Sequence, residues 1–194
     1  MFRYLKIYKA LLKANLIALT AYRANFVNST ISSFMWGVFS IVTVLLLTSR
    51  VTSVVGWSRE DLIILTAVYA LIVGIFHIFF SRNFERFARV IAWGTFDSVL
   101  LKPIDSQFSI SFWEINYPAL SRIFLGVLLL IYMLFSFSYS VDFLSAIFFV
   151  SLLGAGVLSL YSLWLFAATL LIWVPQLTNI IELMYTINGF TRIP

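Results

Sequence analysis

The sequence predicts an all-α integral membrane protein, because it is rich in apolar residues, poor in charges and built of long uncharged runs. Of its 194 residues, 62% are hydrophobic and 11% are charged, whereas soluble domains carry about a quarter charged residues. A core of this size cannot hide so much apolar surface from water, so lipid or neighbouring spans must cover it. These proportions exclude a soluble globular fold.

The basic residues do not form a patch for nucleic acid. The 13 Lys and Arg exceed the 8 Asp and Glu, which gives a formal net charge of +5, but they are scattered between apolar runs. Membrane topology and contact with the anionic head groups of the lipid bilayer explain this pattern better. The absence of cysteine excludes disulfides, thiolate metal ligands and cysteine nucleophiles.

Residues 1–25 predict an amphipathic helix in the membrane surface. At 100° per residue, basic side chains fall on one side and apolar side chains on the other. The basic side consists of Arg3, Lys6, Lys9 and Lys13. Such a helix lies with its lysines toward the anionic head groups. The alternative is an extension of the first span whose basic side chains snorkel to the surface.

Residues 26–80 predict two spans. The first, from Phe26 to Thr48, contains no ionisable residue and is about 34 Å long as a helix, which is enough for a bilayer. A polar loop follows, in which Trp57 is an interfacial aromatic residue and Ser58 is a helix cap. The second span then runs from about residue 62 to residue 80.

Residues 81–116 predict a membrane-adjacent helical segment, because four acidic and four basic residues make them too polar to span. Apolar side chains recur at helical spacing, as in an amphipathic helix. They are Phe84, Phe87, Val90 and Ile91. We expect Gly94 to end this helix, Asp97 to start the next turn and Pro103 to redirect the chain. The alternative is an ordinary solvated loop that lies on the head groups.

Residues 117–194 predict the remaining spans and a carboxy-terminal segment. A third span begins near Pro118, carries Arg122 at its entrance and ends near residue 137, before a short turn at 138–142. Residues 143–173 are one apolar run, which would be about 46 Å long as a straight helix and exceed a hydrocarbon core of about 30 Å. The weakest points of such a helix are Gly154, Gly156 and the polar pair Tyr161 and Ser162. We therefore expect two spans, roughly 143–160 and 163–186, joined by a tight turn, and about five spans in all. One long tilted helix is the alternative, and it leaves four.

The distribution of Lys and Arg predicts the orientation. They gather in residues 1–25 and 81–116, whereas the external connections hold only Arg50 and Arg59 or none. By the positive-inside rule, the amino terminus and the 81–116 segment are cytoplasmic. Because no external connection is long enough to form a domain, we expect residues 1–194 to form a single transmembrane domain.

The residue types needed for catalysis are missing from the apolar segments. His77 is the sole histidine, and without a second ligand or a neighbouring Ser–Asp pair we expect it to pack at an interface rather than to bind metal. The sequence lacks residues that a zinc site, a catalytic triad and a phosphate-binding Walker A loop each require. We therefore expect a non-catalytic protein with no metal and no cofactor.

One string of residues after the second span carries a family resemblance. It consists of Asn83, Phe87, Ile91, Gly94, Asp97, Leu101, Lys102, Pro103 and Gln107. With the basic helix and two spans before it, this string resembles the membrane subunits of bacterial ATP-binding-cassette type-2 exporters, in the antibiotic or multidrug branch. Residues 190–194 resemble a degraded Phe-Gly-Arg-Tyr-Pro element. The family usually continues into one more span, so we expect the final family span to be missing here.

The resemblance implies a permease without catalytic activity. In that family, two permease subunits in the bacterial plasma membrane pair with two cytoplasmic ATPase subunits, and the loop after the second span presents a short coupling helix to the ATPase. The candidate docking or coupling residues are then Arg82, Asn83, Arg86, Phe87, Arg89, Gly94, Asp97, Leu101, Lys102, Pro103 and Gln107. The amino-terminal helix would brace the same interface, and substrate would move between the two permease copies.

A structural or assembly protein, which holds a membrane complex together without moving substrate, is the alternative. Gly154, Gly156 and the aromatic faces of the spans would serve helix packing in either case. A membrane enzyme that acts on lipid is disfavoured, because the catalytic groups are missing.

Overall fold

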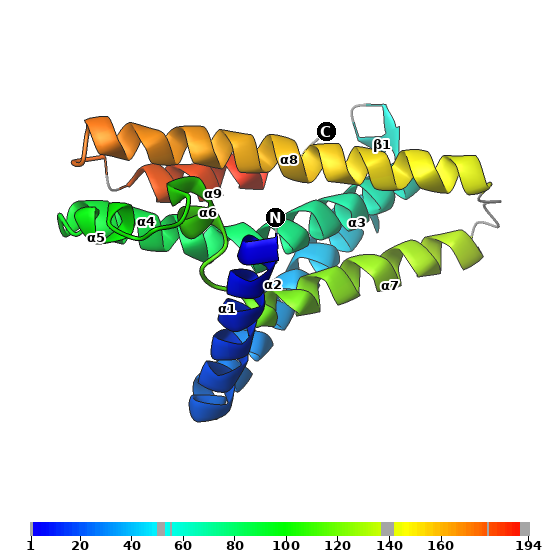
Figure 1. Ribbon diagram of the computed structural model, residues 1–194. Coiled ribbons are helices and arrows are strands. Elements are labelled where there is room, and N and C mark those ends of the chain that lie inside the picture. The colour runs from blue at the N-terminus through cyan, green and yellow to red at the C-terminus, as the bar shows by residue number, and fades with distance from the viewer. Residues whose placement is uncertain (1, 50–52, 55, 137–141, 178, 191–194) are drawn as a thin grey trace.

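The computed structural model describes residues 2–49, 53–54, 56–136, 142–177 and 179–190, and almost all of them are helical (Figure 1). The elements in chain order are α1 (Phe2–Ala21), α2 (Arg23–Ser49), β1 (Ser53–Val54), β2 (Trp57–Ser58), α3 (Arg59–Phe76), η1 (His77–Ser81), α4 (Arg82–Ala92), α5 (Asp97–Leu100), α6 (Ser106–Ser111), η2 (Tyr117–Ala119), α7 (Leu120–Ser136), α8 (Phe143–Trp173) and α9 (Ile180–Phe190). The two short strands pair antiparallel. Residues 138–141 of the predicted turn at 138–142 and the motif residues 191–194 lie outside the described residues.

Four of the described helices are long and apolar enough to cross a membrane, so the chain is an all-α integral membrane protein, as predicted. They are Arg23–Thr48, Arg59–Ala92, Tyr117–Ser136 and Phe143–Trp173. In Figure 1, α3, α7 and α8 run alongside one another, whereas α1 runs across them. The chain turns at Tyr22 between α1 and α2, so α1 is a helix separate from the first span.

The expectation of two spans within residues 143–186 is wrong. α8 is a single helix that passes through Gly154 and Gly156 without a break. The described residues therefore contain four candidate spans, and α9 is a separate short helix that packs against α8. Glycine does not break a helix where no water competes for the backbone, because each N–H must then find its partner inside the segment.

Glycines allow the central helices α3 and α7 to approach closely. A Cβ atom at Gly126 of α7 would lie 3.1 Å from the Leu71 side chain and 3.2 Å from the Ala67 carbonyl oxygen, both on α3. A Cβ atom at Gly74 of α3 would lie 2.9 Å from the Ile123 side chain of α7. Such small residues are typical of helix contacts in membranes, where close backbone approach provides the packing.

The helix of the second span does not end near residue 80. It begins at a capping box, in which the Ser58 hydroxyl accepts a hydrogen bond from the Asp61 N–H and the Asp61 carboxylate accepts one from the Ser58 N–H. After α3, the π-helical turn η1 leads directly into α4, so one helix runs from residue 59 to residue 92. The amphipathic helix expected after the second span is therefore a continuation of that span.

Candidate functional site

Large apolar side chains attach α4 to the helices behind it. Phe84 and Phe87 are 0% and 4% exposed, and they belong to one cluster with Trp164 of α8 and Met184 of α9. The ring centroids of Phe84 and Trp164 lie 6.0 Å apart. On the other side of the helix, Arg89 is exposed. The position of α4 is thus set by packing along one whole face.

Asn83 joins the start of α4 to the end of the polar segment. Its side-chain amide donates hydrogen bonds to the carbonyl oxygens of Phe79, at 2.7 Å, and of Glu114, at 2.8 Å. Its Oδ1 accepts a 2.8 Å hydrogen bond from the Glu114 N–H. Because Asn83 is 2% exposed, these three bonds satisfy a buried amide and also hold together two distant parts of the chain.

Arg86 and Lys102 both lie over the indole ring of Trp113. The distance to the ring centroid is 4.4 Å from Arg86 Cζ and 3.9 Å from Lys102 Nζ. Arg86 Nη1 also lies 3.7 Å from a Glu114 carboxylate oxygen. Burial, together with the charge of Arg86, lowers the pKa of Lys102 below its ordinary value. Both cations therefore contribute to the internal packing of the segment.

The outer end of α4 is closed by a Schellman motif. The Gly94 N–H bonds to the Ile91 carbonyl oxygen, and the Thr95 N–H bonds to the Val90 carbonyl oxygen, each at 3.0 Å. Gly94 has a φ of 67°, a left-handed conformation that glycine adopts without strain. The predicted end of the helix at Gly94 is therefore confirmed.

Residues 93–101, which we call the tip, present apolar side chains outward. Leu101 is 85% exposed, Trp93 73% and Leu100 55%. Asp97 is exposed among them and starts α5, the single turn predicted at this position. The tip combines apolar side chains and a charge on a backbone that α4 holds in place.

Residues 103–111 are tied to α8. Gln107 Nε2 donates a 3.0 Å hydrogen bond to the Tyr161 hydroxyl, which also shares a 2.9 Å hydrogen bond with Ser111 Oγ. Asp105 begins α6 by accepting a 2.8 Å bond from the Phe108 N–H. The segment therefore returns toward the spans immediately after the tip.

The amino-terminal helix α1 braces the same segment. Arg3 Nη2 donates a 2.7 Å hydrogen bond to the Pro103 carbonyl oxygen, and Asn15 Nδ2 donates one of 3.1 Å to the Trp113 carbonyl oxygen. Between these bonds, aromatic rings of α1 meet rings of the segment edge to face. The pairs are Tyr4 with Phe108, at 5.0 Å, and Tyr8 with Phe112, at 6.1 Å. Part of the apolar side of α1 thus packs on protein.

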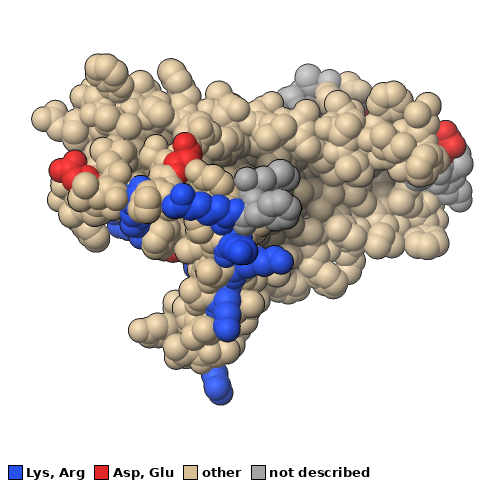
Figure 2. Space-filling view, in the orientation of Figure 1, with Lys and Arg blue, Asp and Glu red and all other residues tan. Residues whose placement is uncertain are grey.

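The basic side of α1 remains on the surface. Lys6, Lys9 and Lys13 are exposed, and Figure 2 shows Lys and Arg side chains along α1 and near α4, whereas the surface of α8 is almost free of charge. This separation of charged and apolar surface is typical of a helix that lies against head groups beside apolar spans.

The predicted docking residues differ in their exposure and in what they contact. Arg89, Asp97 and Leu101 are exposed at the tip or beside it. Asn83 and Phe87 are buried and hold the segment in place. Arg82 is different, because it lines a cavity beside α2. A docking role for these residues stays a prediction.

Three residues that fix the segment were not predicted from the sequence. Arg86 and Lys102 lie over the ring of Trp113. The backbone N–H and carbonyl groups of Glu114 both bond to the side chain of Asn83, and the Tyr161 hydroxyl accepts a hydrogen bond from Gln107 of α6. A tryptophan within a polar segment was the one available signal. The backbone of Glu114 carries no signal in the sequence, because any residue type provides the same N–H and carbonyl groups.

Four long apolar helices with an amphipathic segment at one end define an integral membrane protein. The family described as ABC-2 family transporter protein matches residues 34–194, which is most of the chain and includes the whole segment from α4 to α6. The chain therefore belongs to this family and is a membrane transporter permease, a class of domain that is generally non-catalytic. Neither the curated proteins nor the solved structures gave a match.

Proposed function

We propose that this chain is the permease subunit of an ATP-driven exporter, paired with a second permease copy and coupled to a separate ATPase through residues 81–107. The subunit lies in the bacterial plasma membrane with its amino terminus and its coupling segment in the cytoplasm. ATP is hydrolysed in the partner chain, and substrate crosses between the two permease copies as the ATPase subunits close and open.

The observation that carries this proposal is the exposed tip on a rigid support. Leu101 and Trp93 expose most of their surface, although the backbone behind them is held by the Phe84 cluster, by Asn83 and by α1. An apolar side chain on a fixed backbone loses little conformational entropy on binding. Such a side chain suits the centre of an interface, where a few residues provide most of the binding free energy.

The continuity of α3 and α4 supports a coupling role. Because one helix runs from residue 59 to residue 92, a displacement of the tip is transmitted directly to the second span. Rigid elements of this kind turn a small shift at one site into a movement of a whole helix. The concentration of Lys and Arg residues in α1 and in the segment supports a cytoplasmic position for both.

The test is co-purification of the tagged full-length protein in mild detergent, followed by mass spectrometry and an ATPase assay of the eluate. We expect a cassette ATPase to be recovered with the wild type. Burying a leucine side chain contributes about 2 kcal/mol, so Leu101→Ala should weaken the association by about tenfold to thirtyfold.

Phe143→Ala is the matched control, because Phe143 is 79% exposed at the start of α8, at the other end of the spans. This variant should leave recovery of the ATPase unchanged. An equal loss in both variants would contradict docking at the tip. Recovery of no ATPase, under conditions that preserve a control transporter, would contradict the exporter proposal and favour a scaffold.

A further inference from the structure

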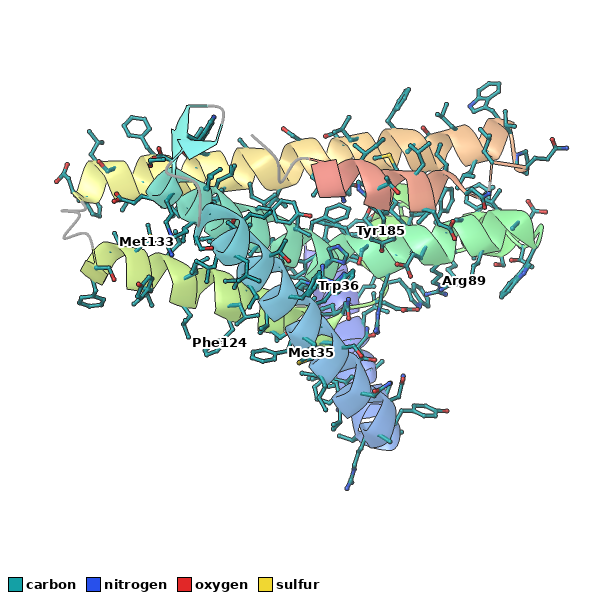
Figure 3. The ribbon with its side chains drawn as sticks, turned by 180° about the vertical axis from the view of Figure 1, so that it is seen from behind. Met35, Trp36, Arg89, Phe124, Met133 and Tyr185 are labelled. Carbon is teal, nitrogen blue, oxygen red and sulfur yellow. The ribbon has the colours of Figure 1, made fainter. Side chains whose placement is uncertain are left out.

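A cavity of about 680 Å³ lies between α2, α3, α7 and α9. One wall is aromatic, since the nearly parallel rings of Trp36 and Phe39 have centroids 5.7 Å apart. The opposite wall is polar and includes His77, Arg82 and Arg122. Figure 3 shows Trp36 of α2 and Tyr185 of α9, which also lines the cavity, on the same side of the molecule. A volume of this size is typical of sites for small molecules.

The polar wall is built around the π-helical turn η1. Turns of this kind are rare and occur frequently at functional sites. His77 and Ser81, at the two ends of η1, both line the cavity, and Arg82 follows directly. Within the turn, the Ser81 hydroxyl donates a 3.2 Å hydrogen bond to the His77 carbonyl oxygen. The irregular turn therefore brings His77, Ser81 and Arg82 to one site.

The charges of the polar wall are not balanced. Glu85, the one acidic residue among the described residues that line the cavity, accepts a hydrogen bond from the Tyr185 hydroxyl. Arg82 and Arg122 form no ion pair within the described part of the chain. The Nε atom of Arg122 is buried without a hydrogen-bond partner there. A guanidinium among apolar helices is costly unless an anion compensates its charge.

A second hollow of about 560 Å³ continues the cavity along α2. It shares Trp36, His77, Arg82 and Arg122 with the first hollow. Besides Trp36, its α2 side consists of small polar residues, which are Asn28, Ser29, Ser32 and Ser33. A polar path therefore leads from the end of α2 that adjoins α1 to the two arginines.

We propose that this cavity binds an anionic amphiphile, with Arg82 and Arg122 contacting its phosphate or carboxylate group and Trp36 and Phe39 contacting its apolar part. Arginine holds either anion through charge-assisted hydrogen bonds. The polar path along α2 admits the head group, while the aromatic wall receives the tail. The occupant is a phospholipid of the bilayer or a transported compound of the same chemistry. Only the second source rests on the proposed function.

The test uses the full chain in phosphatidylcholine nanodiscs without any ATPase. Isothermal titration compares dodecyl phosphate with dodecyltrimethylammonium, which has the same tail and the opposite charge. We expect saturable binding of dodecyl phosphate alone, and Arg122→Gln should weaken this binding by about tenfold or more. Arg59→Gln is the matched control, because Arg59 is exposed at the start of α3 and lines neither hollow.

A measurement on the wild type keeps the test independent of how the variants fold. Dodecyl phosphate should raise the unfolding temperature of the wild type, and dodecyltrimethylammonium should not, since only a molecule that binds the native state stabilises it. Arg82→Gln provides a second loss of charge on the same wall. Equal affinity for both probes, or unchanged affinity in both the Arg82→Gln and Arg122→Gln variants, would overturn the proposal.

Phosphatidylglycerol in the nanodisc distinguishes the two sources. Loss of dodecyl phosphate binding in its presence identifies a bilayer lipid as the occupant, whereas undiminished binding identifies a free amphiphile. Because no ATPase is present, failure of this binding and failure of the co-purification are separate results.

Discussion

Replacing Asn83 by alanine should detach the end of the polar segment from α4. The change removes three hydrogen bonds, two donated to the carbonyl oxygens of Phe79 and Glu114 and one accepted from the Glu114 N–H. At about 0.5–1.5 kcal/mol net for each bond, the free energy of unfolding should fall by about 2–4 kcal/mol. For a chain of this size, that corresponds to a decrease of roughly 5–15 °C in the unfolding temperature.

The assay is thermal unfolding of the detergent-solubilised protein, followed by tryptophan fluorescence, together with hydrogen exchange at the Glu114 amide. Asn83→Asp should not restore stability, because it keeps one acceptor but places a carboxylate against two carbonyl oxygens. Asn25→Ala, at an exposed position of α2, is the control and should resemble the wild type. The reasoning is refuted if Asn83→Ala unfolds at the temperature of the control and the exchange rate at Glu114 is unchanged.

Two further predictions concern helix packing and the packed lysine. Gly126→Ala should lower the free energy of unfolding by about 1–3 kcal/mol, because its Cβ would press on Leu71 and on the Ala67 carbonyl oxygen. Gly154→Ala is the control and should not lower it, because Gly154 has open space around it. Equal unfolding temperatures for the two variants would contradict this packing. Arg86→Gln should raise the pKa of Lys102, measured by NMR of ¹³C-methylated lysines, because burial and the charge of Arg86 together lower it. Lys102 releases its ammonium proton at a lower pH in the folded protein than in the unfolded chain, so its contribution to the free energy of unfolding rises with pH up to the ordinary lysine range. A pKa of Lys102 that does not change on substitution would contradict this explanation.

Most of the fold follows from the composition and from local signals. Ser58 caps the second span, Pro118 lies in the first turn of the third, and Gly94 ends α4, as their residue types predict. These features depend on neighbours in the sequence. The single helix α8 was the alternative rather than the expectation, because glycine favours turns in water. In the structure Gly156 lies inside a continuous helix, where an added Cβ atom would lie 2.8 Å from the Ile72 side chain of α3.

The cavity could not be predicted, because its residues come from distant parts of the chain. His77 was interpreted as an isolated packing residue, and Arg122 as a basic residue at the entrance of a span. Only the packing of α2, α3, α7 and α9 brings them together with Tyr185 and Trp36. The position of Arg82 has the same cause, since the π turn before it changes the direction in which α4 presents its first residue.

The hydrogen bonds between α1 and residues 103–113 can form only after both segments have been synthesised. Arg3 is translated 100 residues before Pro103, and Asn15 98 residues before Trp113. At about 5–20 residues per second, α1 waits roughly 5–20 s until its protein partners exist. On the prediction that α1 lies in the membrane surface, lipid covers Tyr4 and Tyr8 during that interval, and their rings later pack on Phe108 and Phe112. The same prediction gives the amphipathic pattern of α1 a role in the nascent chain, before its contacts with residues 103–113 can form.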